Sequence, residues 1–193
     1  MSSAAIVTTP VEGQLPGQRD IWMLVLFEAV VFGSYFVVYM LYRSWDPQGF
    51  LDAQQHLNQN FGVANTVILL ISSWLAARGV QASREGQLPR AQAFLAGTIA
   101  CGLLFVAFKL LEWWLKIDAG FMLSTNRFFS FYYFLTGIHV VHVLFGFVFL
   151  GVAIHQLRSP QQRSQKTIEA GAIFWHMVDF LWVIIFALLY VMR

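Results

Sequence analysis

Five long apolar stretches constrain the fold of this chain more than any other feature. They cover residues 21–42, 61–82, 91–115, 128–157 and 171–192, most of the 193-residue chain. A helix needs about 20 mainly apolar residues to cross a bilayer. A segment in lipid must satisfy its backbone hydrogen bonds as a helix or within a closed barrel. The runs are continuous rather than alternating, unlike barrel strands. We therefore predict an all-α integral membrane bundle of five transmembrane helices.

Composition supports this prediction, because only 11% of the residues are charged and 58% are hydrophobic. Soluble domains usually carry about 25% charged residues. The net charge of +2 gives no electrostatic case for binding nucleic acid. Residues 1–20 form a polar tail that lacks the basic start and short apolar core of a signal peptide. We expect one membrane domain over residues 21–193.

The basic residues indicate an orientation, since cytoplasmic loops carry an excess of Lys and Arg. With five spans, the N-terminus and the loops near 78–90 and 158–170 share one side. That side holds seven basic residues and the other holds four. We predict that the N-terminus lies inside and the C-terminus outside.

Several ionisable side chains lie within the apolar stretches, where a charge at a helix centre costs about 2.5–3.5 kcal/mol on insertion scales. They are Glu28, Lys109, Glu112, His139, His142, His176 and Asp179. Within each helix these groups and other polar or small residues share one face, which suits helix packing. Lys109 and Glu112 are three residues apart and can pair.

Three interpretations of these groups remain open from the residues alone. They can be hydrogen-bonded packing devices between helices. They can form a metal or haem site from His139, His142 and His176 with Glu28 or Asp179, since imidazole and carboxylate suit several metals. They can also form a cluster that handles protons or contacts lipid.

Two segments carry a family resemblance. Leu135–Gly146 reads LTGIHVVHVLFG, and Glu169–Trp182 reads EAGAIFWHMVDFLW. They resemble the two signature segments of subunit III of the haem-copper oxidases. Glu28, the Asn65-Thr66 pair and Glu112 are similar to earlier motif positions of that family. The resemblance covers about residues 20–193 and corresponds to the five-helix form of the family.

The resemblance implies a non-redox accessory subunit in a bacterial cytoplasmic membrane. Such a subunit packs on subunit I, binds phospholipid in a cleft and supports proton uptake, assembly or stability. It has no catalytic residue, cofactor or metal of its own, and haem, with or without copper, lies in the partner. Glu28 matches the carboxylate that faces the lipid cleft and is related to proton transfer. The positions that match bundle-tying residues are Asn65, Glu112, His139, His142, Glu169, Trp175, His176, Asp179 and Trp182.

The family serves cytochrome c oxidases, quinol oxidases and nitric oxide reductases. Two segments favour the branch associated with nitric oxide reductase: SSW at Ser72–Trp74 and FWHMVDFLW at Phe174–Trp182. The alternative functions are an independent membrane haem or metal protein and a transporter. A transporter would favour broken helices and inverted repeats, and neither is evident in the sequence.

Overall fold

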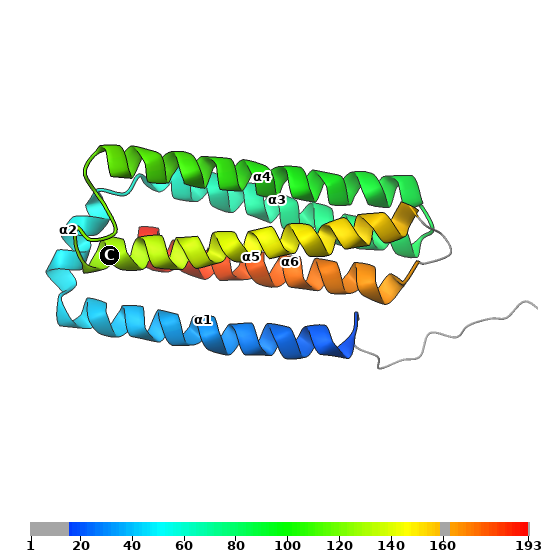
Figure 1. Cartoon of the computed structure of the whole chain (residues 1–193), viewed down its shortest axis with the longest axis horizontal. Coiled ribbons are helices and arrows are strands. Elements are labelled where there is room, and N and C mark those ends of the chain that lie inside the picture. Colours follow the sequence, from blue (N-terminus) through cyan, green and yellow to red (C-terminus); the bar gives the residue numbers. More distant parts are fainter. Residues whose placement is uncertain (1–15, 159–162, 193) are drawn as a thin grey trace, which may run out of the picture.

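The computed structural model describes residues 16–158 and 163–192. Five long helices make up most of this part of the chain (Figure 1). They are α1 (Arg19–Trp45), α3 (Gln59–Arg84), α4 (Leu88–Asp118), α5 (Arg127–Arg158) and α6 (Gln165–Phe186). All five are long and apolar enough to cross a membrane, the last together with the π-helix η2 (Ala187–Val191) that continues it. The predicted all-α bundle with five apolar helices is confirmed.

The first four long helices extend beyond the predicted spans at both ends, and the last one extends beyond its span at the start. A helix can continue past the hydrocarbon core where its polar end is capped. The largest difference is at α6, which begins at Gln165 rather than residue 171. The side chain of Ser164 accepts from the backbone N–H of Thr167 and caps this extra turn. Glu169 therefore lies inside the helix. The predicted polar tail falls mostly on residues 1–15, which lie outside the described residues.

A short helix, α2 (Pro47–Gln55), occupies the connection between α1 and α3 and was not predicted as a helix. Pro47 stands in its first turn, and the carboxylate of Asp46 accepts from the N–H of Gly49 at 3.1 Å. Both are recognised signals for the start of a helix. The segment is short and only weakly apolar, so the search for spans passed over it.

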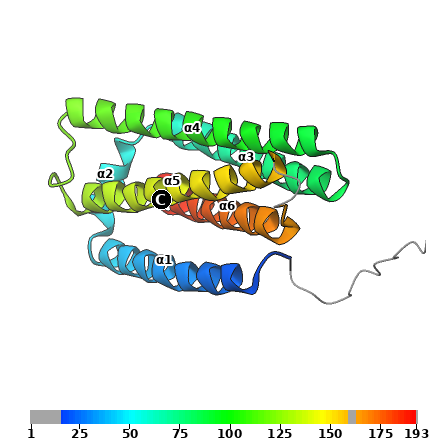
Figure 2. The ribbon, with the colours of Figure 1, turned by 45° about the vertical axis from the view of Figure 1, so that its right-hand side comes forward.

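The long helices run side by side, with α1 at one edge of the bundle (Figures 1 and 2). The helices α3 and α4 form an antiparallel hairpin through a turn in which Gly86 has φ +76°. The helix α6 packs against both α5 and α3, so it is the most enclosed span, and α1 is the least enclosed.

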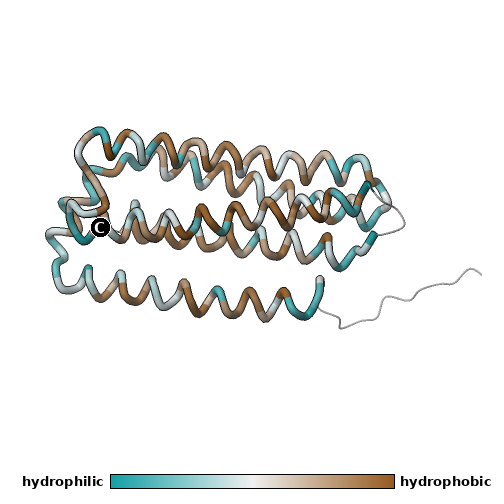
Figure 3. Tube along the Cα trace, viewed as in Figure 1, coloured by the Kyte–Doolittle hydropathy of each residue, from teal (hydrophilic) through white to brown (hydrophobic). Residues whose placement is uncertain are grey.

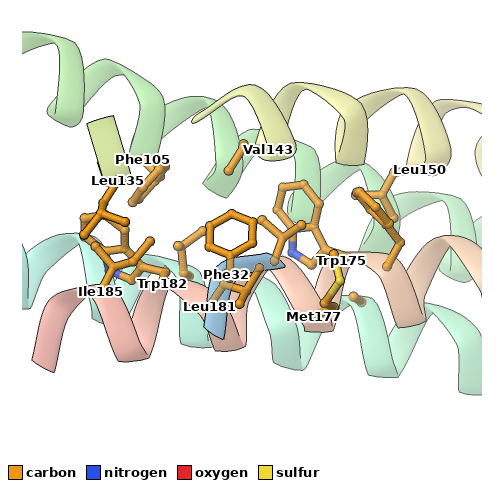
Figure 4. Close-up of a cluster of buried hydrophobic side chains, with 14 of the residues drawn as sticks. Phe32, Phe105, Leu135, Val143, Leu150, Trp175, Met177, Leu181, Trp182 and Ile185 are labelled. Carbon is orange, nitrogen blue, oxygen red and sulfur yellow. The ribbon is translucent and has the colours of Figure 1, made fainter. Parts of the chain in front are cut away.

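Apolar residues run along all five long helices and polar residues gather at the helix ends (Figure 3). Many apolar side chains on α1 and α4 face outward and are exposed in the isolated chain. The buried core lies between α6 and its neighbours. In Figure 4, Trp182 lies beside Phe105 at one part of this core, and Trp175 lies two turns closer to the start of α6. The ring centroids of Phe105 and Trp182 are 4.7 Å apart.

Candidate functional site

A carboxylate and an imidazole join α1 to α5 within the apolar length of both helices. Glu28 Oε2 lies 3.1 Å from His142 Nε2, and the two side chains are only 15% and 12% exposed. The other ring nitrogen of His142, Nδ1, lies 2.8 Å from the carbonyl oxygen of Ile138. The sequence motif therefore places its second histidine against the carboxylate of the first span.

The hydrogen bonds of His142 fix its chemistry. A carbonyl oxygen can only accept, so Nδ1 carries a proton and donates it to Ile138. The contact between Nε2 and Glu28 then contains one shared proton. It is either a carboxylic acid donating to a neutral ring or an imidazolium donating to a carboxylate. The shared proton can thus lie on either group while the hydrogen bond is kept.

Aromatic residues hold the rest of α1 against α5 on the same side as Glu28. Phe32 packs edge-on against His142 with centroids 5.1 Å apart, and it is fully buried. Farther along α1, Tyr35 packs against Phe134 and Tyr39 against Phe131, with centroids at 5.1 and 5.6 Å. Edge-to-face rings at these distances add about 0.5–1.5 kcal/mol beyond area burial. The side of α1 that carries Glu28, Tyr35 and Tyr39 therefore faces α5.

The signature segment on α6 is bound to hydroxyl groups of α3. Trp175 Nε1 donates to Ser72 Oγ at 2.6 Å, and His176 Nδ1 and Ser73 Oγ share a hydrogen bond of 2.7 Å. Nearly two turns closer to the start of α3, Thr66 Oγ1 accepts from Trp182 Nε1 at 3.1 Å. The sequence did not predict these hydroxyl partners. The Ser72-Ser73 pair beside the Trp-His pair is the signal that could have identified two of them.

The ring of Trp175 contacts three other helices at once. It lies against Gly146 of α5 and Gly102 of α4, where an added Cβ would come within 2.7 and 2.6 Å of its ring carbons. Phe147 of α5 stacks on it with centroids 5.7 Å apart. Only glycine leaves room for the indole at both places. The single residue Trp175 therefore determines how closely α4 and α5 can pack against α6.

The predicted pair of Lys109 and Glu112 is present and fully buried. Lys109 Nζ donates to Glu112 Oε2 at 2.7 Å and to the hydroxyl of Tyr190 at 2.9 Å. Tyr190 in turn donates to Glu112 Oε1 at 2.8 Å. The ammonium also lies over the rings of Trp182 and Tyr132, 4.8 and 5.2 Å from their centroids. Hydrogen bonds and ring faces thus surround a charge pair that burial would otherwise penalise.

Tyr190 was missed as a site residue. It lies in η2, where the N–H of Met192 bonds to the carbonyl of Ala187 at 2.9 Å. Two side chains bind other carbonyls of this segment. Tyr39 donates to Leu188 at 3.1 Å and Gln59 to Tyr190 at 2.8 Å. A hydroxyl near the end of the last span was the available signal, but the wider π-helical turn is not visible in the sequence.

Three other predicted residues are buried in the interior. Asn65 and His139 are fully buried, and Asp179 is 5% exposed. Their side-chain polar atoms have no hydrogen-bond partner within residues 16–158 and 163–192. His139 instead lies between two aromatic rings, with centroids 5.5 Å from Phe105 and 5.3 Å from Trp182. These groups are therefore polar positions inside the bundle rather than parts of the Glu28 pair.

Glu169 connects three elements at the end of the bundle where α1 begins. Its Oε2 accepts from the backbone N–H of Gly17 at 2.9 Å, and its Oε1 accepts from Arg84 Nε at the same distance. Gln165 also donates to Oε1 at 3.2 Å. The start of α1, the end of α3 and the first turns of α6 therefore meet at one carboxylate.

The grouping required by the metal-site interpretation does not occur in the described part of the chain. No cluster of three or more His, Cys, Asp or Glu side chains there has the geometry to hold a metal ion. The three histidines have separate partners: Glu28 for His142, Ser73 for His176, and aromatic rings for His139.

Comparison with known proteins identifies the family. The family model for cytochrome c oxidase subunit III matches residues 19–193. The chain belongs to the cytochrome c oxidase subunit III family. The predicted resemblance is confirmed, and so is its functional class, an accessory subunit of haem-copper oxidase complexes.

Relatives of this subunit III family member come from different oxidases. It is 33% identical to cytochrome c oxidase subunit 3 of Synechocystis sp., over 91% of this chain and 78% of that protein. It is 26% identical to cytochrome bo(3) ubiquinol oxidase subunit 3 of Pseudomonas aeruginosa, over 89% of this chain and 82% of that one. It is also 26% identical to the haem-copper oxidase subunit I+III of Aeropyrum pernix, over 88% of this chain and 22% of that protein.

Proposed function

We propose that this chain is the non-redox third subunit of a bacterial haem-copper respiratory complex, in which it packs on subunit I. The membership of the family carries the proposal. The Aeropyrum relative adds support, because its name joins subunits I and III in one protein. Haem, with or without copper, belongs to the partner, and this chain contributes binding surface, lipid contacts and stability.

Glu28 and His142 carry the proton-related part of the proposed role. Their contact contains one shared proton, lies between two membrane helices and is slightly exposed. In this proposal the pair exchanges a proton with its surroundings. The packing of Phe32 and Tyr35 keeps α1 attached to α5 meanwhile. The proposed effect is to sustain proton uptake by subunit I and the lifetime of the complex.

The remaining motif residues have the proposed role of tying the bundle together. Glu169 binds the start of α1 and the end of α3, and Trp175 is bonded to α3 and packed on α4 and α5. Glu112 holds Lys109 and Tyr190. The other motif residues with this proposed role lie along α3, α5 and α6: Asn65, His139, His176, Asp179 and Trp182. A subunit that stabilises a larger complex needs a bundle of fixed shape, and these contacts supply one.

The proposed location is the bacterial cytoplasmic membrane, with the start of α1 inside and the end of η2 outside. The two ends lie at opposite ends of the bundle, as five spans require (Figure 1). Seven basic residues at the proposed inner end against four at the outer end support the orientation. They are Arg19, Arg78, Arg84, Arg90, Arg158, Arg163 and Lys166.

We also propose, as a second candidate, that the complex reduces nitric oxide rather than oxygen. The two segments that favour this branch contact each other, through Trp175 with Ser72 and His176 with Ser73. The two segments that resemble this branch therefore form one structural unit of the bundle.

Purification of the affinity-tagged chain in a mild detergent tests both candidates. Mass spectrometry of the co-purifying proteins and a visible spectrum are recorded on the same sample. We expect a stoichiometric subunit I with a haem spectrum, and the identity of that subunit decides between oxygen and nitric oxide. A colourless chain purified without a partner would count against the accessory role, and haem bound to the isolated chain would overturn it.

A further inference from the structure

A polar pocket lies at the end of the bundle where α2 connects α1 to α3. Its volume is about 270 Å³, and α2, the start of α3 and η2 contribute to its lining. Among the described residues, no Asp, Glu, Lys, Arg or His lines it. Five of its lining residues carry side-chain amides: Gln54, Gln55, Asn58, Gln59 and Asn60.

Gln54 is the buried amide of this lining, with only 6% of the residue exposed. Its Oε1 accepts from Arg43 Nη1 at 3.5 Å. Its Nε2 has no hydrogen-bond partner within residues 16–158 and 163–192. A buried donor without an acceptor lowers the stability of a fold. Methionine or leucine would fill the same space without that cost, so we infer that Gln54 has a partner that is not part of this chain.

The chemistry of the lining indicates what kind of group this partner is. A side-chain amide offers both donors and an acceptor. The pocket also lies between the end of α2 and the start of α3, where free helix carbonyls and free helix N–H groups carry opposite partial charges. An uncharged group that both donates and accepts, such as a carboxamide or a peptide group, fits this environment better than an ion does.

The size of the pocket excludes a helix as its occupant. One helical turn is about 10–12 Å across and 5.4 Å long, which corresponds to about 420–610 Å³. This volume exceeds that of the pocket. A side chain or an extended peptide from a loop is small enough, and Leu51 and Leu57 in the lining can pack on its apolar part.

We propose that this pocket receives an uncharged amide group from an extramembrane loop of a partner subunit, and that the carbonyl oxygen of this group accepts from Gln54. The occupant is an asparagine or glutamine side chain or a peptide bond. The inference rests on the proposed function, because it requires a partner whose loops reach the end of the bundle that carries α2. It adds a contact outside the bilayer to the packing between membrane helices.

Two glutamines of α2 provide a matched test. Gln54→Met keeps the length of the side chain and removes the amide. Gln48→Met makes the same substitution on the same helix but outside the pocket. Gln48 is exposed and bonds only to Asp52 of its own helix, at 3.2 Å. A third variant, Gln55→Trp, blocks the pocket from an exposed position and leaves the buried lining unchanged.

The measurement is the rate at which this chain dissociates from the complex during detergent washing, with the complex held through a tag on subunit I. Loss of one hydrogen bond should make Gln54→Met dissociate about 2- to 10-fold faster than the wild type. Gln55→Trp should also dissociate faster, and Gln48→Met should keep the wild-type rate. Equal rates in all four proteins would overturn the proposal. Faster dissociation of Gln54→Met without an effect of Gln55→Trp would reduce Gln54 to a structural role and would also overturn it.

A photoreactive amino acid at position 55 of the intact complex identifies the occupant. We expect a crosslink to an extramembrane loop of a co-purified subunit, mapped by mass spectrometry of the digested complex. Crosslinks to solvent or detergent alone would overturn the proposal. Absence of subunit I from the wild-type preparation would contradict the proposed function itself, whereas an intact complex without the loop crosslink contradicts only the role of the pocket.

Discussion

The ring of Trp175 lies so close to the backbone of Gly146 that a Cβ there would approach Cε3 to 2.7 Å. The contact is between α6 and α5, and the same indole donates to Ser72 of α3 at 2.6 Å. One side chain thus fixes the spacing of two helices and is itself fixed by a third.

Gly146→Ala should destabilise the bundle by about 1–3 kcal/mol, because an added methyl in a packed interior forces shifts in its neighbours. The free energy of unfolding in mixed detergent measures the effect. Gly151→Ala on the same helix is the control, since nothing lies within 4 Å of its added Cβ. Equal stability of the two variants would show that the approach of Trp175 to α5 is not constrained.

Removal of Lys109 alone should cost more than removal of the whole charge pair. Lys109→Met leaves Glu112 buried without its cation, which we expect to cost about 3–5 kcal/mol. The double variant Lys109→Met/Glu112→Leu removes both charges and should be clearly more stable than the single variant. Thermal unfolding of the three proteins makes the comparison. If the double variant is less stable than Lys109→Met, the idea that each buried charge mainly offsets the burial cost of the other is wrong.

Glu28 and His142 should be energetically coupled across the α1–α5 contact. A double-mutant cycle with Glu28→Ala and His142→Ala should give a coupling energy of about 0.5–1.5 kcal/mol. The matched cycle pairs Glu28 with His176, which bonds to Ser73 instead, and should give a coupling near zero. Comparable values in the two cycles would mean that the hydrogen bond contributes nothing specific.

The turnover lifetime of the complex tests the functional side of the same pair. Glu28→Gln keeps a hydrogen-bonding group but removes the acid, so assembly should be preserved while the lifetime during turnover falls. A lifetime equal to that of the wild type, with unchanged lipid content, would argue against a proton-related role for Glu28.

Glu169→Ala should loosen the start of α1, because the carboxylate accepts the N–H of Gly17 and also holds Arg84. Faster hydrogen exchange at the backbone amides of residues 17–22 is the expected readout. Glu85→Ala is the control, since Glu85 bonds locally to Gln81 and Gln87 at the same end of the bundle. Unchanged exchange in Glu169→Ala would show that α1 is held by its other contacts.

The sequence predicted the five spans well because length and continuous apolarity are local properties that a bilayer selects directly. It also predicted the Lys109–Glu112 pair, since residues three apart on a helix are neighbours wherever the helix lies. The helix ends were less accurate. Caps such as Ser164, rather than hydropathy, decide where a helix begins.

Contacts between helices could not be predicted in the same way. Which of two histidines meets Glu28 depends on how α1 and α5 are rotated, and the spacing of His139 and His142 does not contain that information. The structure assigns His142 to Glu28 and encloses His139 among aromatic rings. The hydroxyl partners of Trp175 and His176 were similarly hidden, because they lie on another helix about a hundred residues earlier in the chain.

The π-helical segment Ala187–Val191 has a consequence for the length of the last span. Its wider turn brings the hydroxyl of Tyr190 to the buried lysine and carboxylate, while side chains of α1 and α3 hold its carbonyls. Deleting one residue from this segment would rotate Tyr190 by about 100° and carry its hydroxyl away from both charges. The contacts of Tyr190 with Lys109 and Glu112 thus require a fixed number of residues between Phe186 and Met192, as well as a tyrosine at position 190.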